Sequence, residues 1–119
     1  MTKARWIIMV LIAMVSVISL QASADEYSAR QARQYTQEAE YYQKKAENYR
    51  READYYKRKA EGYQREAAYY IKKGDASRAK DYNRMASRAM DDYNTQMRYA
   101  KNADEKAADY LKRAARLLK

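Results

Sequence analysis

Between residues 32 and 70 the hydrophobic positions repeat every seven residues. Alanine occupies one position of the repeat, and tyrosine occupies the position three residues later. The two series are Ala32, Ala39, Ala46, Ala53, Ala60, Ala67 and Tyr35, Tyr42, Tyr49, Tyr56, Tyr63, Tyr70. Apolar residues spaced alternately by three and four are typical of the a and d positions of a coiled coil. The pattern predicts a helix over about 27–73, with alanine at a and tyrosine at d.

A second series with the same alternating spacing follows residue 75. Its members are Ala79, Tyr82, Ala86, Ala89, Tyr93, Gln96, Ala100, Ala103, Ala107, Tyr110, Ala114 and Leu117. Lys72 and Lys73 suit the end of the first helix. Gly74 suits the left-handed position after it, and Asp75 can cap the next helix. We expect a turn at 74–75 and a second helix over about 76–118, and so short a link makes the helices antiparallel neighbours.

The outer positions of the first helix are patterned as well. The b positions carry acids, and the f positions four residues later carry bases, in the order that stabilises a helix by about 0.2–0.5 kcal/mol per pair. These pairs are Glu40 and Lys44, Glu47 and Arg51, Asp54 and Arg58, Glu61 and Arg65. The g positions alternate in sign along Glu38, Lys45, Glu52, Lys59, Glu66 and Lys73. The repeating unit is therefore a double heptad.

Large side chains also lie beside both seams. At c of the first helix, Tyr41, Tyr55 and Tyr69 alternate with the smaller Asn48 and Gly62, and at e of the second helix stand Met90, Met97, Leu111 and Leu118. These apolar faces are wider than one partner helix can cover. We predict an all-α fold, a long antiparallel coiled-coil helical hairpin that self-associates into a helical bundle. Tyr41, Tyr55, Tyr69, Met90 and Met97 are the expected partner contacts, with the c-position rings entering the spaces at Asn48 and Gly62 of a neighbouring helix.

The first 24 residues differ from the rest. Lys3 and Arg5 precede an apolar run over 6–20, and Ala22 and Ala24 follow where a signal peptidase would read them. This three-part pattern is typical of a secretory signal peptide. The apolar run is also shorter than a membrane-spanning helix, which needs about 20 residues. We expect cleavage after Ala24, leaving 25–119 in the periplasm or outside the cell. The alternative is a small subunit of a membrane complex, anchored by an uncleaved N-terminal helix.

The composition argues against an enzyme. The 119 residues include no His and no Cys, so the usual transition-metal ligands, an imidazole base and a thiol nucleophile are missing. Adjacent carboxylates such as Asp91 and Asp92 point to different faces of a helix and make a poor chelate. We therefore expect no catalytic site, no metal, no cofactor and no small-molecule substrate.

The charge supplies an alternative function. Lys and Arg number 25 against 16 Asp and Glu, a formal net charge of +9. Basic patches lie at 57–59, at 72–73 and at Lys112, Arg113, Arg116 and Lys119. Such a chain could instead bind an anionic envelope polymer or a membrane surface. Nucleic acid is not an expected partner, because an exported protein does not meet it.

The alanine heptads over 39–67 and 100–114, with the C-terminal Arg116, Leu117, Leu118 and Lys119, resemble alanine-zipper envelope proteins of the murein lipoprotein type. The resemblance implies an envelope location and, through Lys119, attachment to peptidoglycan. The chain departs from that family in having no Cys to be lipidated, a turn at Gly74 and tyrosine at the other seam position. We expect a secreted structural or interaction protein that self-associates or docks on an envelope component.

Overall fold

The computed structural model describes residues 26–118, which form two helices. Helix α2 spans Glu26–Lys72, helix α3 spans Ala76–Leu117, and residues 73–75 join them. The predicted all-α helical hairpin is confirmed. The predicted signal peptide, with Ala22 and Ala24 at its cleavage site, and the C-terminal Lys119 lie outside the described residues.

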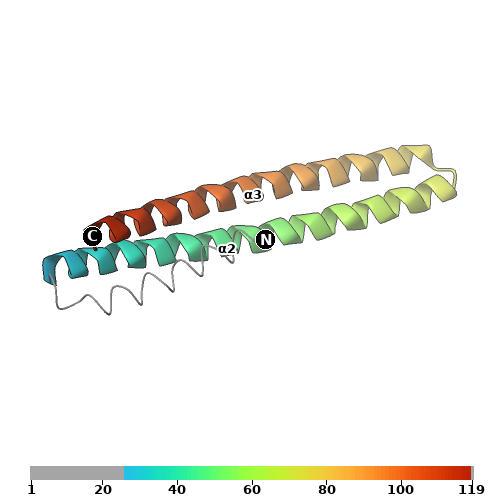
Figure 1. Cartoon of the computed structure of the whole chain (residues 1–119). Coiled ribbons are helices and arrows are strands. Elements are labelled where there is room, and N and C mark those ends of the chain that lie inside the picture. The colour runs from blue at the N-terminus through green and yellow to red at the C-terminus, as the bar shows by residue number, and fades with distance from the viewer. Residues whose placement is uncertain (1–25, 119) are drawn as a thin grey trace. The chain divides into compact units, whose positions relative to one another are not determined.

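The hairpin divides into two compact units, each containing a segment of both helices. The terminal unit contains residues 26–46 of α2 and 101–118 of the C-terminal part of the chain, and the turn unit contains Glu47–Ala100. In each unit the segment of α2 lies beside the segment of α3 and runs in the opposite direction (Figure 1).

Alanine and tyrosine divide the seam between them. On α2 the a-position alanines are fully buried, and on α3 the seam alanines are buried as well: Ala32, Ala39, Ala46, Ala53, Ala60, Ala67, Ala79, Ala86, Ala89, Ala100, Ala103, Ala107 and Ala114. The tyrosines at d of α2, together with Tyr82, Tyr93 and Tyr110 of α3, are half-buried. A half-buried ring can cover the seam while its hydroxyl stays in water. Over residues 26–118 no buried side-chain nitrogen or oxygen lacks a hydrogen-bond partner.

In the terminal unit the ring of Tyr110 lies between two tyrosines of α2. Its centroid is 6.0 Å from that of Tyr35 and 5.8 Å from that of Tyr42, with the second pair nearly parallel at 10°. Tyr42 and Tyr110 also pack on a cluster of buried residues formed by Ala39, Ala107 and Leu111. The small a-position side chains thus leave room for stacked rings beside them.

The turn unit repeats this arrangement. Tyr82 lies between Tyr63 and Tyr70, with ring centroids 6.2 Å and 5.5 Å apart, and the second pair is again nearly parallel at 7°. Tyr49 packs on Tyr99 at 5.4 Å. The same sequence repeat therefore produces the same packing of three rings in both units.

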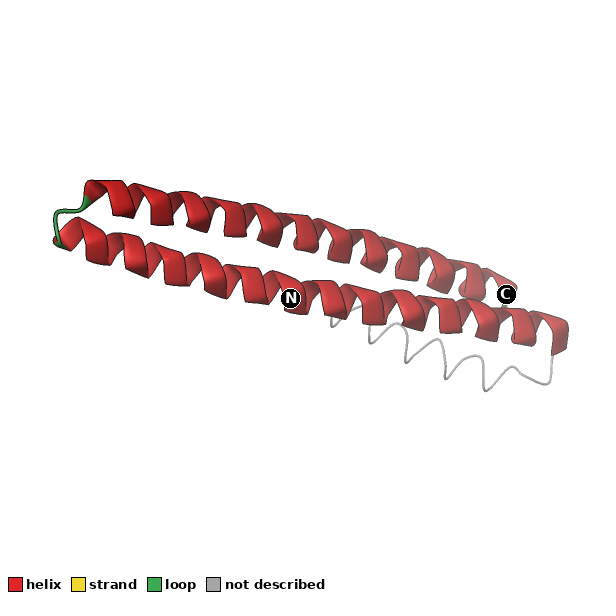
Figure 2. Ribbon diagram, turned by 180° about the vertical axis from the view of Figure 1, so that it is seen from behind, coloured by secondary structure: helices red, strands yellow, loops and turns green. Residues whose placement is uncertain are grey.

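The turn has the hydrogen bonds of a Schellman motif. Gly74 has a φ of 80°, the Gly74 N–H donates to the Ile71 carbonyl at 3.1 Å, and the Asp75 N–H donates to the Tyr70 carbonyl at 2.9 Å. The Asp75 carboxylate then accepts from the Arg78 N–H at 3.1 Å, which caps the start of α3. The link that results is short (Figure 2), which explains why the two helices are antiparallel neighbours.

The terminal unit covers one residue that the sequence placed on an outer edge. Leu111 is only 4% exposed and packs against Ala39 and Ala107 of the hairpin itself. The expectation that it widens an outer apolar face was wrong. Its branched side chain is long enough to reach across the seam from e, because the alanines at a leave space there. Thr36 is buried too, and its Oγ1 donates to the Ala32 carbonyl at 2.9 Å.

Candidate interaction face

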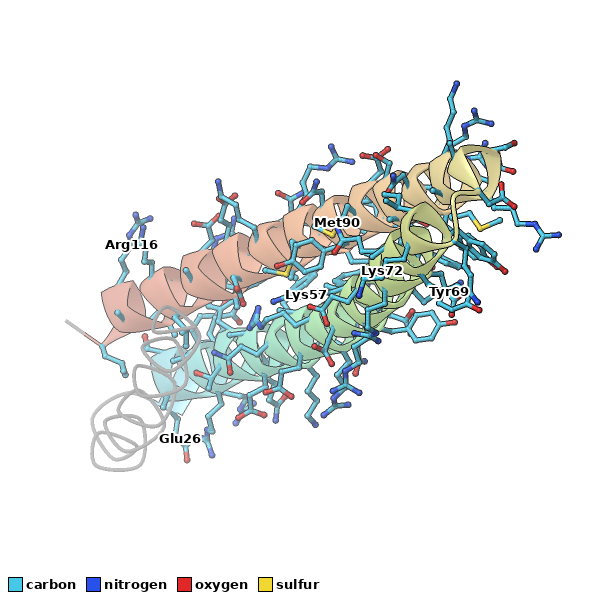
Figure 3. All side chains as sticks on the ribbon, turned by 90° about the vertical axis from the view of Figure 1, so that its right-hand side faces the viewer. Glu26, Lys57, Tyr69, Lys72, Met90 and Arg116 are labelled. Atoms are coloured by element: carbon cyan, nitrogen blue, oxygen red, sulfur yellow. The ribbon has the colours of Figure 1, made fainter. Side chains whose placement is uncertain are left out.

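The c position of α2 carries a series of tyrosines that α3 leaves half exposed. Tyr41, Tyr55 and Tyr69 are 52%, 53% and 51% exposed. Each ring stands edge-on against the seam tyrosine that follows it, with centroid distances of 5.2–5.4 Å. Figure 3 shows Tyr69 standing out from the side of α2 near the turn. Tyr41 belongs to the terminal unit, and Tyr55 and Tyr69 belong to the turn unit. In each unit we call these rings, with the g-position side chains of α2 beside them, the tyrosine face of that unit.

A lysine lies over each of these rings. The ammonium nitrogens of Lys45, Lys59 and Lys73 are 5.0, 5.4 and 5.5 Å from the ring centroids of Tyr41, Tyr55 and Tyr69. Residues four apart are neighbours on a helix surface, and an ammonium above a ring is attracted to its negative face. Each tyrosine is therefore held between a second ring and a cation, with about half of its surface open.

Between these rings the c position is small and the g position is acidic. In the turn unit the order along α2 is Asn48 with Glu52, Tyr55 with Lys59, Gly62 with Glu66, and Tyr69 with Lys73. A Cβ built at Gly62 would meet only the Arg65 guanidinium, at 3.9 Å. Asn48 is occupied locally, because its Oδ1 accepts from Arg51 at 3.3 Å. Along α2, a tyrosine accompanied by a lysine thus alternates with a smaller residue accompanied by a glutamate.

Helix α3 borders the tyrosine face through its own g positions. In the turn unit Arg78 lies 5.4 Å from the Tyr70 ring and Tyr99 packs on Tyr49. In the terminal unit Lys106 lies 5.3 Å from the Tyr42 ring. Sequence reasoning did not assign these residues to the site. The predicted antiparallel arrangement could have found them, because it brings the g edges of two helices to the same side of their seam.

The two predicted methionine contacts lie elsewhere. Met90 and Met97 occupy e of α3, and e and g flank a coiled-coil seam on opposite sides. Met90 is half-buried and Met97 is 38% exposed. The structure therefore does not bring them together with Tyr55 and Tyr69, and the contact expected from the sequence divides into two faces.

The described residues show no other chemistry around this face. Within 26–118 no group of three or more acidic side chains could hold a metal ion. Neither α2 nor α3 has a stretch long and apolar enough to cross a membrane. No family model matches the chain, and neither the curated proteins nor the solved structures contain a match. The candidate site is therefore described by its geometry alone.

Proposed function

We propose that this is an exported structural or interaction protein, whose hairpin presents the tyrosine face to another helical surface in the cell envelope. That surface is either a second copy of the chain or an envelope component. The proposal is supported by one observation above others: half-exposed tyrosines recur at fixed spacing along α2, and α3 does not cover them.

Ordered aromatic rings are well suited to binding. Tyrosine supplies a large contact area and is enriched at the centres of protein interfaces. Each ring of the tyrosine face is already held by a neighbouring ring and a lysine. Little side-chain freedom would be lost on binding, so more of the contact energy would appear as affinity.

The spacing of the rings favours a helical partner. Tyr55 and Tyr69 are both in the turn unit and are separated by about 21 Å along α2 at a rise of 1.5 Å per residue. Gly62 lies halfway between them. Such a row of projections and gaps matches the ridges and grooves by which helices pack.

Photo-crosslinking in living cells tests this function. A photoreactive amino acid replaces Tyr55 in the full chain, and a matched variant carries it at Arg58, an exposed position four residues from the acid Asp54 on the same helix. We expect a discrete crosslinked product from position 55 and none from position 58, and mass spectrometry identifies the captured protein. Absence of a product at 55, or equal products at both positions, contradicts the proposal.

One observation supports a second function, binding to an anionic surface through the turn. Ile71 is 63% exposed beside Lys72 and Lys73. An exposed aliphatic side chain among bases suits contact with an anionic membrane. Vesicles with and without anionic phospholipid test it. Binding only to anionic vesicles, lost near about 0.5 M salt because of screening, supports this function, whereas salt-independent binding or none contradicts it.

A further inference from the structure

We infer that the partner of the tyrosine face is a second copy of this chain, running parallel and shifted by seven residues along α2. The inference rests on the proposed function, because it names the occupant of the same face. It is drawn from the turn unit alone, where the alternation of Asn48, Tyr55, Gly62 and Tyr69 lies within one compact body.

Gly62 provides the first step. A glycine in a helix interior is less favourable than alanine, because it has more conformational freedom to lose. Nothing in its own hairpin requires glycine at this position, since an added Cβ would meet only the Arg65 guanidinium at 3.9 Å. The open space is on the c side of α2, between Tyr55 and Tyr69. It is a gap that a ring from outside the hairpin can enter.

The charges provide the second step. The g positions of the turn unit read Glu52, Lys59, Glu66 and Lys73. A uniform polyanion would meet an acid at every second position, so it does not match this face. A second surface with the same alternation of acids and bases pairs each acid with a base when it is shifted by seven residues, half of the 14-residue repeat. The chain itself carries such a surface.

A parallel shift of seven residues satisfies size and charge together. Equivalent heptad positions face each other in a parallel pair of helices. Tyr55 then stands opposite the partner's Gly62, and Lys59 stands opposite the partner's Glu66. A shift of zero, in contrast, places ring against ring and lysine against lysine. The offset of about 10 Å follows from the rise of the helix.

Charge reversal tests the register. The full chain is expressed, the protein is purified in the form that the cells produce, and its self-association is measured by analytical ultracentrifugation at physiological salt. Lys59→Glu alone and Glu66→Lys alone should each weaken self-association by roughly tenfold. Mixing the two variants should restore it, because Glu at 59 then faces Lys at 66. Lys57→Glu is the control, with the same change of charge at an exposed e position outside the tyrosine face.

Gly62→Leu tests the gap separately. The leucine should keep the helix content by circular dichroism, since the space is open in the hairpin, and should abolish self-association. A monomeric native chain, a mixture no better than either charge variant, or Gly62→Leu that associates normally overturns the inference. Crosslinking from position 55 to a different protein would leave the proposed function standing while this inference fails.

Discussion

Alanine at a and tyrosine at d make different contributions to the seam. Ala39 and Ala53 are at most 1% exposed, so their methyl groups are buried at the seam. The tyrosines contribute the buried area, but their rings remain half open to water. The alanine positions should therefore be the less tolerant of added volume.

Enlarging a buried alanine should destabilise the hairpin. Ala53→Leu adds three carbons at a buried position of the seam, and we expect this overpacking to lower the free energy of unfolding by about 1–3 kcal/mol. Ala68→Leu is the matched control, because Ala68 is exposed on the same helix and should change stability by at most about 0.5 kcal/mol. Thermal unfolding followed by circular dichroism measures both. Equal effects of the two would contradict the assignment of Ala53 to the seam.

The two glycines should respond to alanine with opposite signs. Gly74 has a φ of 80°, where an L side chain costs about 1–2 kcal/mol, so Gly74→Ala should destabilise the hairpin. Gly62 lies within α2 and has room for a methyl group, so Gly62→Ala should stabilise it by about 0.5–1 kcal/mol. Urea unfolding of the two variants checks the signs, and a stabilised Gly74→Ala would show that the turn is not built as described.

At the scale of the helix, each unit depends on one tyrosine of α3 placed between two of α2. Tyr82 contacts both Tyr63 and Tyr70 in the turn unit. Each stacked or tilted pair adds about 0.5–1.5 kcal/mol beyond area burial. A single substitution at Tyr82 therefore removes two ring contacts.

Tyr82→Ala should lower the free energy of unfolding by about 2–4 kcal/mol, somewhat less than for a fully buried aromatic residue. Tyr82→Phe keeps the ring and loses only the hydroxyl, so it should change stability by less than about 1 kcal/mol. Chemical denaturation of both variants distinguishes the ring from the hydroxyl. A Phe variant as unstable as the Ala variant would mean that the hydroxyl, not the stacking, stabilises the pair of helices.

Local signals in the sequence were enough to locate the helices. The heptads with Gly74 and Asp75 predicted helices over 27–73 and 76–118, and the structure has 26–72 and 76–117. The burial of residues beside the seam could not be predicted from these local signals. Leu111 and Met97 both occupy e of α3, but only Leu111 is buried. Which residue meets which depends on the pairing of segments distant in the chain, and that pairing leaves no periodic signal.

At the scale of the whole molecule, the exposed ion pair on α2 adds little to the pairing of the two helices. Asp54 and Arg58 approach to 2.9 Å, but both side chains are more than half exposed, and both lie on α2. Exposed pairs of this kind contribute about 0–1 kcal/mol. Alanines, leucines and stacked tyrosine rings join α2 to α3, and so do Lys106 over the Tyr42 ring and Arg78 over the Tyr70 ring.

Folding and self-association should therefore differ in their response to salt. Between about 0.05 and 0.5 M salt, where screening strengthens markedly, we expect the melting temperature of a dilute sample to shift by no more than a few degrees. Self-association should weaken over the same range, because it depends on Lys59 and Glu66. Circular dichroism and ultracentrifugation measure the two separately. A melting temperature that falls by much more than a few degrees in high salt would contradict this view of its stability.

The Gly74 turn has one more consequence. The alternating alanines and tyrosines of α2 look the same after displacement by one heptad, so α3 could slide along α2 and pack almost equally well. The tether of three residues over 73–75 removes that freedom, because it is too short to span the extra distance of about 10 Å. If a protease cut the tether, the two separated helices could pair in registers shifted by one or more heptads. The single native register would then be replaced by a mixture of registers.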